Sequence, residues 1–141
     1  MPVKIDRLSV HEDARGLVFE PLAADLITAQ RNVHVVTSGP GVVRGNHHHL
    51  KGTEIIAVAG PALVRIREDG KLRDIEVPDR QVYRFILPPR VSHAIKNTGD
   101  LQNVLVAFNT VEHDPQHPDT VHDVLIESGV SNRLAESERF L

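Results

Sequence analysis

The sequence has no cysteine and no tryptophan, and it has one tyrosine and one methionine in 141 residues. Without cysteine the chain can form no disulfide framework and no thiolate metal site, and it has no thiol nucleophile. The length is enough for one domain with a hydrophobic core of ordinary size.

Long apolar runs and blocks of positive charge are also missing. No stretch of about 18 apolar residues is present, which excludes a membrane-spanning helix. The first six residues contain no apolar core of the signal-peptide type, so we expect a cytoplasmic protein. The formal net charge is −3 and the basic residues form no patch, so we expect no nucleic-acid partner.

Short β-strands are predicted along most of the chain. Residues 62–67 alternate apolar and charged side chains, as an antiparallel strand with one buried face does. Asp69-Gly70 is typical of a hairpin turn. About ten such strands, separated by Gly, Pro and Asp turns, indicate an all-β fold: a double-stranded β-helix, or jelly-roll, barrel.

We expect a single domain over residues 1–141, with the barrel at about residues 1–111 and a loop and tail at 112–141. The tail begins with a polar, proline-punctuated stretch, which predicts a surface loop. Residues 131–139 could add a short helix with Ser131 as N-cap. Residues 103–109 are apolar on both faces, which hints at a subunit contact and favours a homodimer.

Histidines are frequent, and His47 and His49 are the most informative of the nine. On a strand, imidazoles two residues apart leave from the same face. Glu54 follows after enough residues for a tight turn, and His93 begins a strand behind Pro88-Pro89. Three imidazoles and one carboxylate suit a divalent transition metal, whereas the competing interpretation is a solvated, histidine-rich loop. Zinc is our first choice, with iron, manganese, nickel or cobalt as alternatives.

The other histidines receive structural interpretations. His48 should point away from its two neighbours, and His34, between two valines, is interpreted as a hydrogen-bonded core residue. The polar loop and tail contain three histidines that we interpret as solvated: His113, His117 and His122.

These residues resemble the two motifs of the cupin superfamily. The first motif, a glycine followed by His-x-His and glutamate, is matched by Gly41, His47, His49 and Glu54. The second motif is matched by Pro88, His93 and Asn97. Val82 and Arg90 replace two glycines of the second motif, and these departures concern turns rather than ligands.

A narrower resemblance, to the C-terminal cupin domain of the capsular polysaccharide enzymes of the CapF group, covers most of the chain. Three stretches carry it: Asp13-x-Arg15-Gly16, Arg44-Gly45-Asn46-His47, and Asp114-Pro115 with His117-Pro118-Asp119-Thr120. In that group the cupin epimerises a nucleotide-linked 4-keto sugar at C3, and an attached reductase domain then reduces the ketone. This chain shows no reductase domain, so we expect it to work alone or with a separate partner. Arg-Gly-x-His-x-His is also similar to metal-free nucleotide-sugar 3,4-ketoisomerases and 3,5-epimerases, which commonly lack a glutamate at the place of Glu54.

The resemblance implies proton abstraction next to the carbonyl of a small, sugar-type ligand, with a metal as Lewis acid. Without metal, His47 or His49 could be the base. Lys51 and Tyr83 are the other candidates for acid or base.

Substrate binding is expected around the ligands. Arg44 could pair with a diphosphate or form a structural salt bridge with Asp13 or Glu20. Asn97 and Asn109 could hydrogen-bond around the site. Two other functions stay open: a small-molecule-binding or sensing cupin without turnover, and an iron-dependent cupin dioxygenase.

Overall fold

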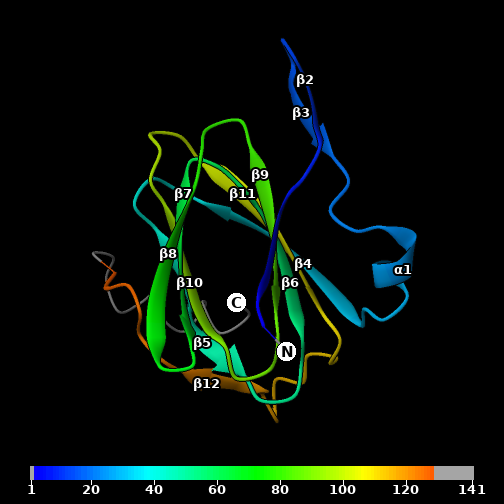
Figure 1. Cartoon of the computed structure of the whole chain (residues 1–141), viewed down its shortest axis with the longest axis vertical. Helices are drawn as coiled ribbons and strands as arrows, with labels where there is room; N and C mark the ends of the chain where they lie inside the picture. The colour runs from blue at the N-terminus through cyan, green and yellow to red at the C-terminus, as the bar shows by residue number, and fades with distance from the viewer. Residues whose placement is uncertain (1, 129–141) are drawn as a thin grey trace.

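The computed structural model describes residues 2–128, which form an almost entirely β structure. Ten of its strands make two five-stranded antiparallel sheets that face each other (Figure 1). The first sheet has the order β1 (Lys4–Arg7), β9 (Val82–Leu87), β6 (Glu54–Ala59), β11 (Asn103–Asn109) and β4 (Asn32–Ser38). The second has the order β12 (Thr120–His122), β5 (Val43–His49), β10 (Ser92–Asn97), β7 (Ala62–Glu68) and β8 (Lys71–Val77). The predicted all-β jelly-roll class is confirmed, as two facing sheets.

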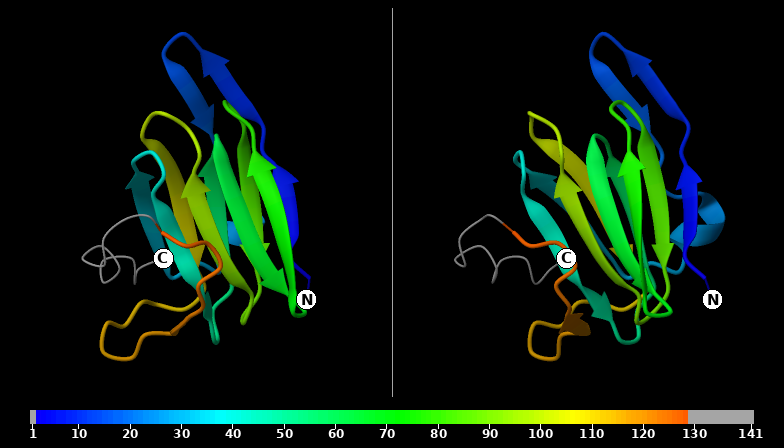
Figure 2. Two further views of the ribbon diagram at one scale, coloured as in Figure 1. Left: turned by 90° about the vertical axis from the view of Figure 1, so that its left-hand side faces the viewer. Right: turned by 60° about the vertical axis from the view of Figure 1, so that its left-hand side comes forward.

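A small hairpin lies outside the two sheets and packs Val10 and Phe19 against the first of them. Its strands, β2 (Val10–Asp13) and β3 (Gly16–Phe19), pair only with each other and project beyond the end of the first sheet (Figure 1, Figure 2). The short helix α1 (Ala24–Ile27) follows it. None of the described residues forms a helix long and apolar enough to cross a membrane.

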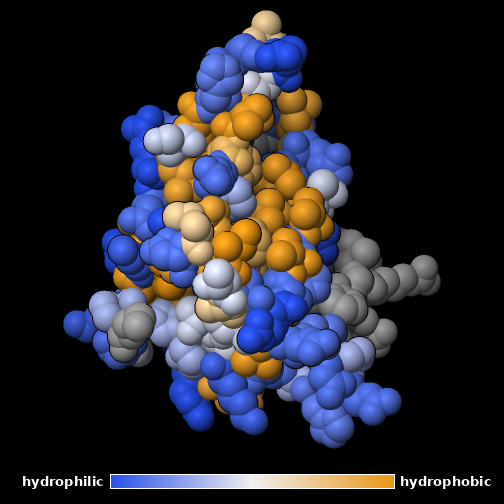
Figure 3. Space-filling view, turned by 90° about the vertical axis from the view of Figure 1, so that its right-hand side faces the viewer, coloured by the Kyte–Doolittle hydropathy of each residue, from blue (hydrophilic) through white to orange (hydrophobic). Residues whose placement is uncertain are grey.

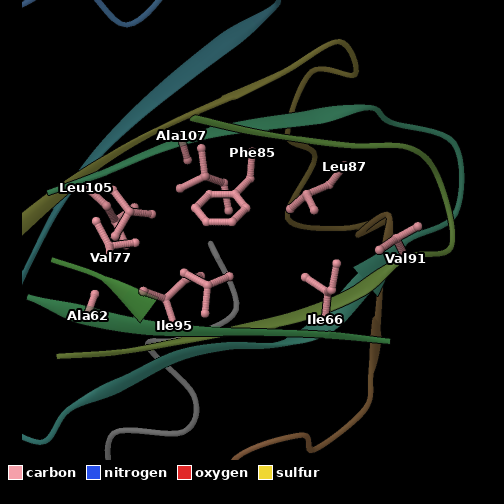
Figure 4. Packing of buried hydrophobic residues seen from close by; sticks show 12 residues of the cluster. Ala62, Ile66, Val77, Phe85, Leu87, Val91, Ile95, Leu105 and Ala107 are labelled. Atoms are coloured by element: carbon pink, nitrogen blue, oxygen red, sulfur yellow. The ribbon is translucent and has the colours of Figure 1, made fainter. Parts of the chain in front are cut away.

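Apolar side chains fill the space between the sheets. Strand alternation sends one side of each strand inward, so Phe85 and Leu87 of the first sheet face Ile66 and Ile95 of the second (Figure 4). Phe85 is 1% exposed and Ile66 is fully buried. Because apolar side chains fill the middle of the space between the sheets, polar side chains can lie only at its ends.

The part of the chain predicted as a loop and tail contributes to the second sheet. Residues Thr120–His122 form β12, which pairs with the end of β5, so the loop prediction was wrong for this short stretch. Leu125 and Ile126 then pack on the outer face of the sheet against Val43. The helix expected at residues 131–139 lies outside the described residues.

Asn46 anchors this C-terminal segment. Its Oδ1 accepts the backbone N–H groups of Leu125 (2.9 Å) and Ile126 (3.1 Å), and its Nδ2 donates to the carbonyl of Ile126 (3.0 Å). The side chain is buried and its φ is +59°, a left-handed conformation that asparagine tolerates better than most residues.

We expect Asn46→Ala to lower the free energy of unfolding by about 2–4 kcal/mol, because buried backbone groups lose their partners and the left-handed conformation becomes less favourable. Urea unfolding followed by circular dichroism measures this change. Asn46→Gly separates the two causes, since glycine restores the backbone freedom but not the hydrogen bonds. Equal midpoints for Asn46→Ala and the wild type would contradict the anchoring role.

Candidate metal centre

Four possible metal ligands meet at one end of the space between the sheets. His47 and His49 come from β5 and His93 from β10, where His93 pairs directly with His47. The turn after β5 returns the chain so that Glu54 begins β6. One side-chain ligand atom from each of the four residues lies within 4.8 Å of the others. The structure therefore brings together the set that the spacing predicted.

A β-bulge aims the two β5 histidines inward. His93 is opposite His47, but Ala94 is opposite Gly45, so Asn46 is an extra residue on β5. In a regular strand of the same sequence, alternation would put residue 47 on the same face as Val43, which packs on the outer side of the sheet. The bulge shifts the alternation by one residue, so that His47 and His49 face inward. Gly45 completes the bulge, because a Cβ there would lie 2.7 Å from the carbonyl oxygen of His93.

The cluster is buried and several of its ligand atoms lack partners. His47, Glu54 and His93 are 4%, 3% and 0% exposed. Among the described residues, the Nε2 atoms of His47 and His93 and Oε1 of Glu54 have no hydrogen-bond partner. The His49 Nε2 contacts the Glu54 carboxylate, and the His93 Nε2 is 3.7 Å from Glu54 Oε1. Burial on this scale contradicts the solvated-loop interpretation.

The protonation states suit metal binding. Burial, reinforced by the neighbouring His93 and His49, lowers the pKa of His47 far below its usual range, and burial also lowers the pKa of His93. Both are therefore neutral, as metal ligands must be. His93 Nδ1 is 3.1 Å from the carbonyl of Val91, which places the proton on Nδ1 and the lone pair on Nε2.

His49 differs from the other two histidines. Burial alone would lower its pKa, but the hydrogen bond and charge of Glu54 outweigh burial and raise it. A metal would have to displace the proton shared by this pair, and Glu54 would then become an anionic ligand. Three nitrogens and one carboxylate oxygen, with their unpaired atoms converging, fit zinc, iron, manganese, cobalt or nickel.

A pocket opens beside His49 and Glu54. Its polar lining comes from β4, from the end of β11 and from the loop before β12: Asn32, His34, Asn109, Glu112, His113, Asp119 and Thr120. The pocket volume is about 30 Å³, comparable to one water molecule. The pocket therefore suits one small reacting group, with the rest of a larger ligand outside it.

Of the other predicted site residues, only Asn109 lines this pocket; its Oδ1 accepts the N–H of Val111 (2.8 Å). Lys51 is exposed, and its backbone N–H donates to Asp119. Tyr83 packs against the central core and pairs with Val58. That position is four residues along β6 from Glu54, or about 13 Å, so Tyr83 is distant from the cluster.

Arg44 and Asn97 are engaged in structural hydrogen bonds. Arg44 donates from Nε to Ser38 Oγ (3.1 Å) and from a terminal nitrogen to the carbonyl of Thr37 (3.0 Å). It does not bond the predicted salt-bridge partner Asp13, which pairs with Arg15. Asn97 Nδ2 donates to the carbonyls of Ser38 (2.9 Å) and Leu101 (2.8 Å). Neither side chain lines the pocket.

Two histidines were assigned wrongly from the sequence. His34 is half-buried and lines the pocket rather than the core, and its neighbours Val33 and Val35 are the exposed side of β4. His113, interpreted as solvated, lines the same pocket, with its ring centroid 6.2 Å from that of His34. The alternation of exposed and half-buried residues along β4 is the pattern that could have shown that His34 lies on the opposite side from Val33 and Val35. His48 does point away from the cluster, toward Ser92 (3.1 Å).

Asp119 belongs to a stretch that carries the family resemblance, but the sequence assigned it no role. Its carboxylate accepts the backbone N–H groups of Lys51 (3.1 Å) and Gly52 (2.9 Å). It thereby fastens the loop before β12 to the turn between the ligands His49 and Glu54.

Comparison with known proteins identifies a family. The model of the "Polysaccharide biosynthesis C-terminal domain" family matches residues 11–121. Among solved structures, the capsular polysaccharide assembling protein CapF from Staphylococcus aureus superposes with a TM-score of 0.62 at 26% identity, covering 84% of this chain and 33% of CapF. QdtA, a sugar 3,4-ketoisomerase from Thermoanaerobacterium thermosaccharolyticum in complex with TDP, has a TM-score of 0.63 at 20% identity and covers 84% of this chain and 86% of QdtA.

Curated relatives have a different name. The 3-hydroxyanthranilate 3,4-dioxygenase of Xanthomonas oryzae is 24% identical over 104 residues, which cover 73% of this chain and 57% of the relative. The mouse enzyme of the same name is 26% identical over 97 residues and is covered to 33%. The chain thus spans 57% of the Xanthomonas enzyme and 33% of CapF.

We expect His49→Ala to lose bound metal. Outer-shell partners alone are worth about 10–100-fold in metal affinity, and removal of a ligand should cost more. Metal analysis of untreated protein and zinc titration of the stripped protein measure this loss. His48→Ala is the matched control, since His48 is the neighbouring imidazole that points away. Full metal content in His49→Ala would contradict the site.

Proposed function

The chain belongs to the polysaccharide biosynthesis C-terminal domain family, and from that premise we propose that it acts on a nucleotide-linked 4-keto sugar. The reaction would be C3 epimerisation or keto-isomerisation, through proton abstraction next to the carbonyl. One observation carries the proposal: a buried His₃Glu cluster with unpaired ligand atoms borders a pocket whose lining includes further imidazole, amide and carboxylate side chains. The similarity to CapF, an assembling protein for capsular polysaccharide, and to QdtA, a sugar 3,4-ketoisomerase, supports it.

A divalent metal would be held by His47, His49, Glu54 and His93. When bound, it supplies Lewis-acid polarisation of a carbonyl oxygen, which stabilises negative charge on that oxygen. The small pocket beside His49 and Glu54 would receive the ketone end of the sugar, and the nucleotide would remain outside.

The chemistry requires only movement of a proton and an electron pair. The C3–H bond breaks, a base takes the proton, and the bonding pair forms the C3–C4 double bond while charge develops on the C4 oxygen. Return of the proton to the other face of C3 gives the epimer. The side chains that ligate the metal would be unavailable as the base, so another residue of the pocket must accept this proton.

We expect the zinc-loaded protein to exchange the C3 hydrogen of TDP-4-keto-6-deoxyglucose with solvent deuterium. Proton NMR in D₂O would show loss of the C3–H signal with time. His49→Ala should slow the exchange by about a hundredfold or more, because Lewis-acid polarisation is worth several kcal/mol. Absence of exchange with this sugar and with its UDP counterpart would overturn the epimerase or isomerase proposal.

An iron-dependent dioxygenase is the second candidate. It is favoured by the match to the 3-hydroxyanthranilate 3,4-dioxygenases and by a nitrogen-and-oxygen donor set that iron also accepts. Oxygen uptake by the Fe(II)-loaded protein with 3-hydroxyanthranilate, in the absence of C3 exchange, would select this activity over sugar modification.

We also propose that a second copy of this chain covers the outer face of the first sheet. Val33 and Val35 of its edge strand are 54% and 69% exposed, and they lie beside Phe108 and Val106 of β11. Figure 3 shows hydrophobic residues gathered on this face. A patch of this kind marks an interaction surface, and a two-fold dimer would bury it twice.

The projecting hairpin supports this arrangement. Val10 and Phe19 of the hairpin pack against Ala57 and Val82 of the first sheet, but Val18 on β3 is 69% exposed. Contact with a second copy would cover Val18 as well as the exposed valines of the sheet.

We expect the wild type to be a dimer in light scattering coupled to size-exclusion chromatography, and Val35→Asp to be a monomer. A charge in the centre of an apolar interface would have to be buried without a partner. Leu101→Asp is the control, since Leu101 is 79% exposed in the turn between β10 and β11. A monomeric wild type, or a dimeric Val35→Asp, would contradict the interface.

A further inference from the structure

We propose that Asp119 is a positioning residue of the metal centre, which controls the placement of the ligands His49 and Glu54 by holding the turn that joins them. The inference rests on the metal site that the proposed function uses, and it is independent of the sugar chemistry. Asp119 is far from both ligands in the sequence. It comes to the site because it directly precedes β12, which pairs with the end of β5.

The turn between the two ligands consists of residues 50–53. His49 is the last residue of β5 and Glu54 is the first residue of β6. The backbone of the four residues between them therefore determines where the two ligand side chains start. Each N–H group of such a turn needs a partner if it is shielded from water, and the source of these partners decides what holds the turn in place.

Asp119 accepts three successive N–H groups of this turn. The N–H of Leu50 is donated to the backbone carbonyl of Asp119 (2.9 Å). The N–H groups of Lys51 (3.1 Å) and Gly52 (2.9 Å) are donated to its carboxylate. Successive backbone N–H groups that converge in this way favour a negative charge, and hydrogen bonds to a carboxylate are about twice as strong as those between neutral groups.

The remainder of the turn is held against the end of β11 and the loop that follows it. The N–H of Thr53 is donated to Oγ1 of Thr110 (3.0 Å), and the N–H of Thr110 is donated to the carbonyl of Thr53 (3.2 Å). A Cβ at Gly52 would overlap Oδ1 of Asn109, so the turn packs closely on this side. These contacts fix the end of the turn next to Glu54, and the Asp119 carboxylate fixes its middle.

Metal binding needs the side chains of His49 and Glu54 at defined places at the same time. Ligands that are already held in place lose little freedom when the metal binds, whereas a loosened turn would let the two side chains separate. Asp119 also lines the same pocket as both ligands, so its negative charge favours a cation there. The two effects act in the same direction, and both would be lost with the carboxylate.

The test is the zinc affinity of Asp119→Ala and Asp119→Asn, measured by titrating the stripped proteins with zinc in the presence of a competing chelator. We expect Asp119→Ala to bind zinc about 10–100-fold more weakly than the wild type, as loss of an outer partner of a metal site does. Asp119→Asn should recover part of this loss, because its amide oxygen can still accept the N–H groups of Lys51 and Gly52 although the charge is gone.

Asp114→Ala is the matched control. Asp114 is another carboxylate of the same loop, but its bonds to the N–H of Gln116 (3.0 Å) and to the ring of His117 (3.1 Å) stay within the loop. Its zinc affinity should equal that of the wild type. The cobalt(II)-loaded proteins give a second readout, because the visible absorption of cobalt depends on the number and arrangement of its ligands. We expect an altered spectrum in Asp119→Ala and the wild-type spectrum in Asp114→Ala.

The outcomes separate this inference from the metal site itself. A wild type that binds zinc, with Asp119→Ala at the same affinity, would overturn the role of Asp119 and leave the metal site intact. Equal losses in Asp119→Ala and Asp119→Asn with an unchanged cobalt spectrum would assign the effect to charge alone and overturn positioning. An equal loss in Asp114→Ala would overturn it in favour of a general loosening of the loop. A wild type that binds no zinc would overturn the metal site and this inference with it.

Discussion

The burial of ligand atoms without hydrogen-bond partners is the constraint on which this structure depends. Each buried polar atom left unpaired costs about 1–3 kcal/mol, and the unpaired Nε2 atoms of His47 and His93 and Oε1 of Glu54 meet here beneath a packed apolar core. A cation shared by the ligand residues would offset this cost, because it gives every lone pair a partner at once. The stability of the two sheets at this end thus depends on the site, and the geometry of the site depends on the sheets.

A single inserted residue connects the site to the rest of the fold. The bulge at Asn46 reverses the alternation of β5, so that Val43 faces outward and His47 faces inward. The same side chain bonds the segment at Leu125 and Ile126, which covers the outer face of the sheet. The residue at the bulge that aims the ligands therefore also fastens the chain beyond β12.

The sequence predicted what depends on local spacing and alternation. His47, His49 and Glu54 could be found because a strand, a turn and a returning strand fix their relative positions, and His93 stood out behind a rigid proline turn. Long-range contacts were not predictable in this way. A bulge at Asn46 leaves no mark on apolar periodicity, and the bonds of Arg44 to β4 depend on how the two sheets pack. His34 was misread because flanking valines were taken as core, whereas that side of β4 is exposed.

The same ligand set could serve sugar chemistry or oxygen chemistry. The residues that line the pocket therefore have to distinguish the two activities. Oxygen activation needs open positions at the metal and a lining that resists protonation of reactive intermediates. A proton transfer next to a ketone needs a fixed base within reach of the carbon. The wall beside Glu54 carries the half-buried imidazoles of His34 and His113 and the side-chain amides of Asn32 and Asn109. That lining is suited to moving protons, and this is the physical reason for placing sugar modification ahead of oxygenation.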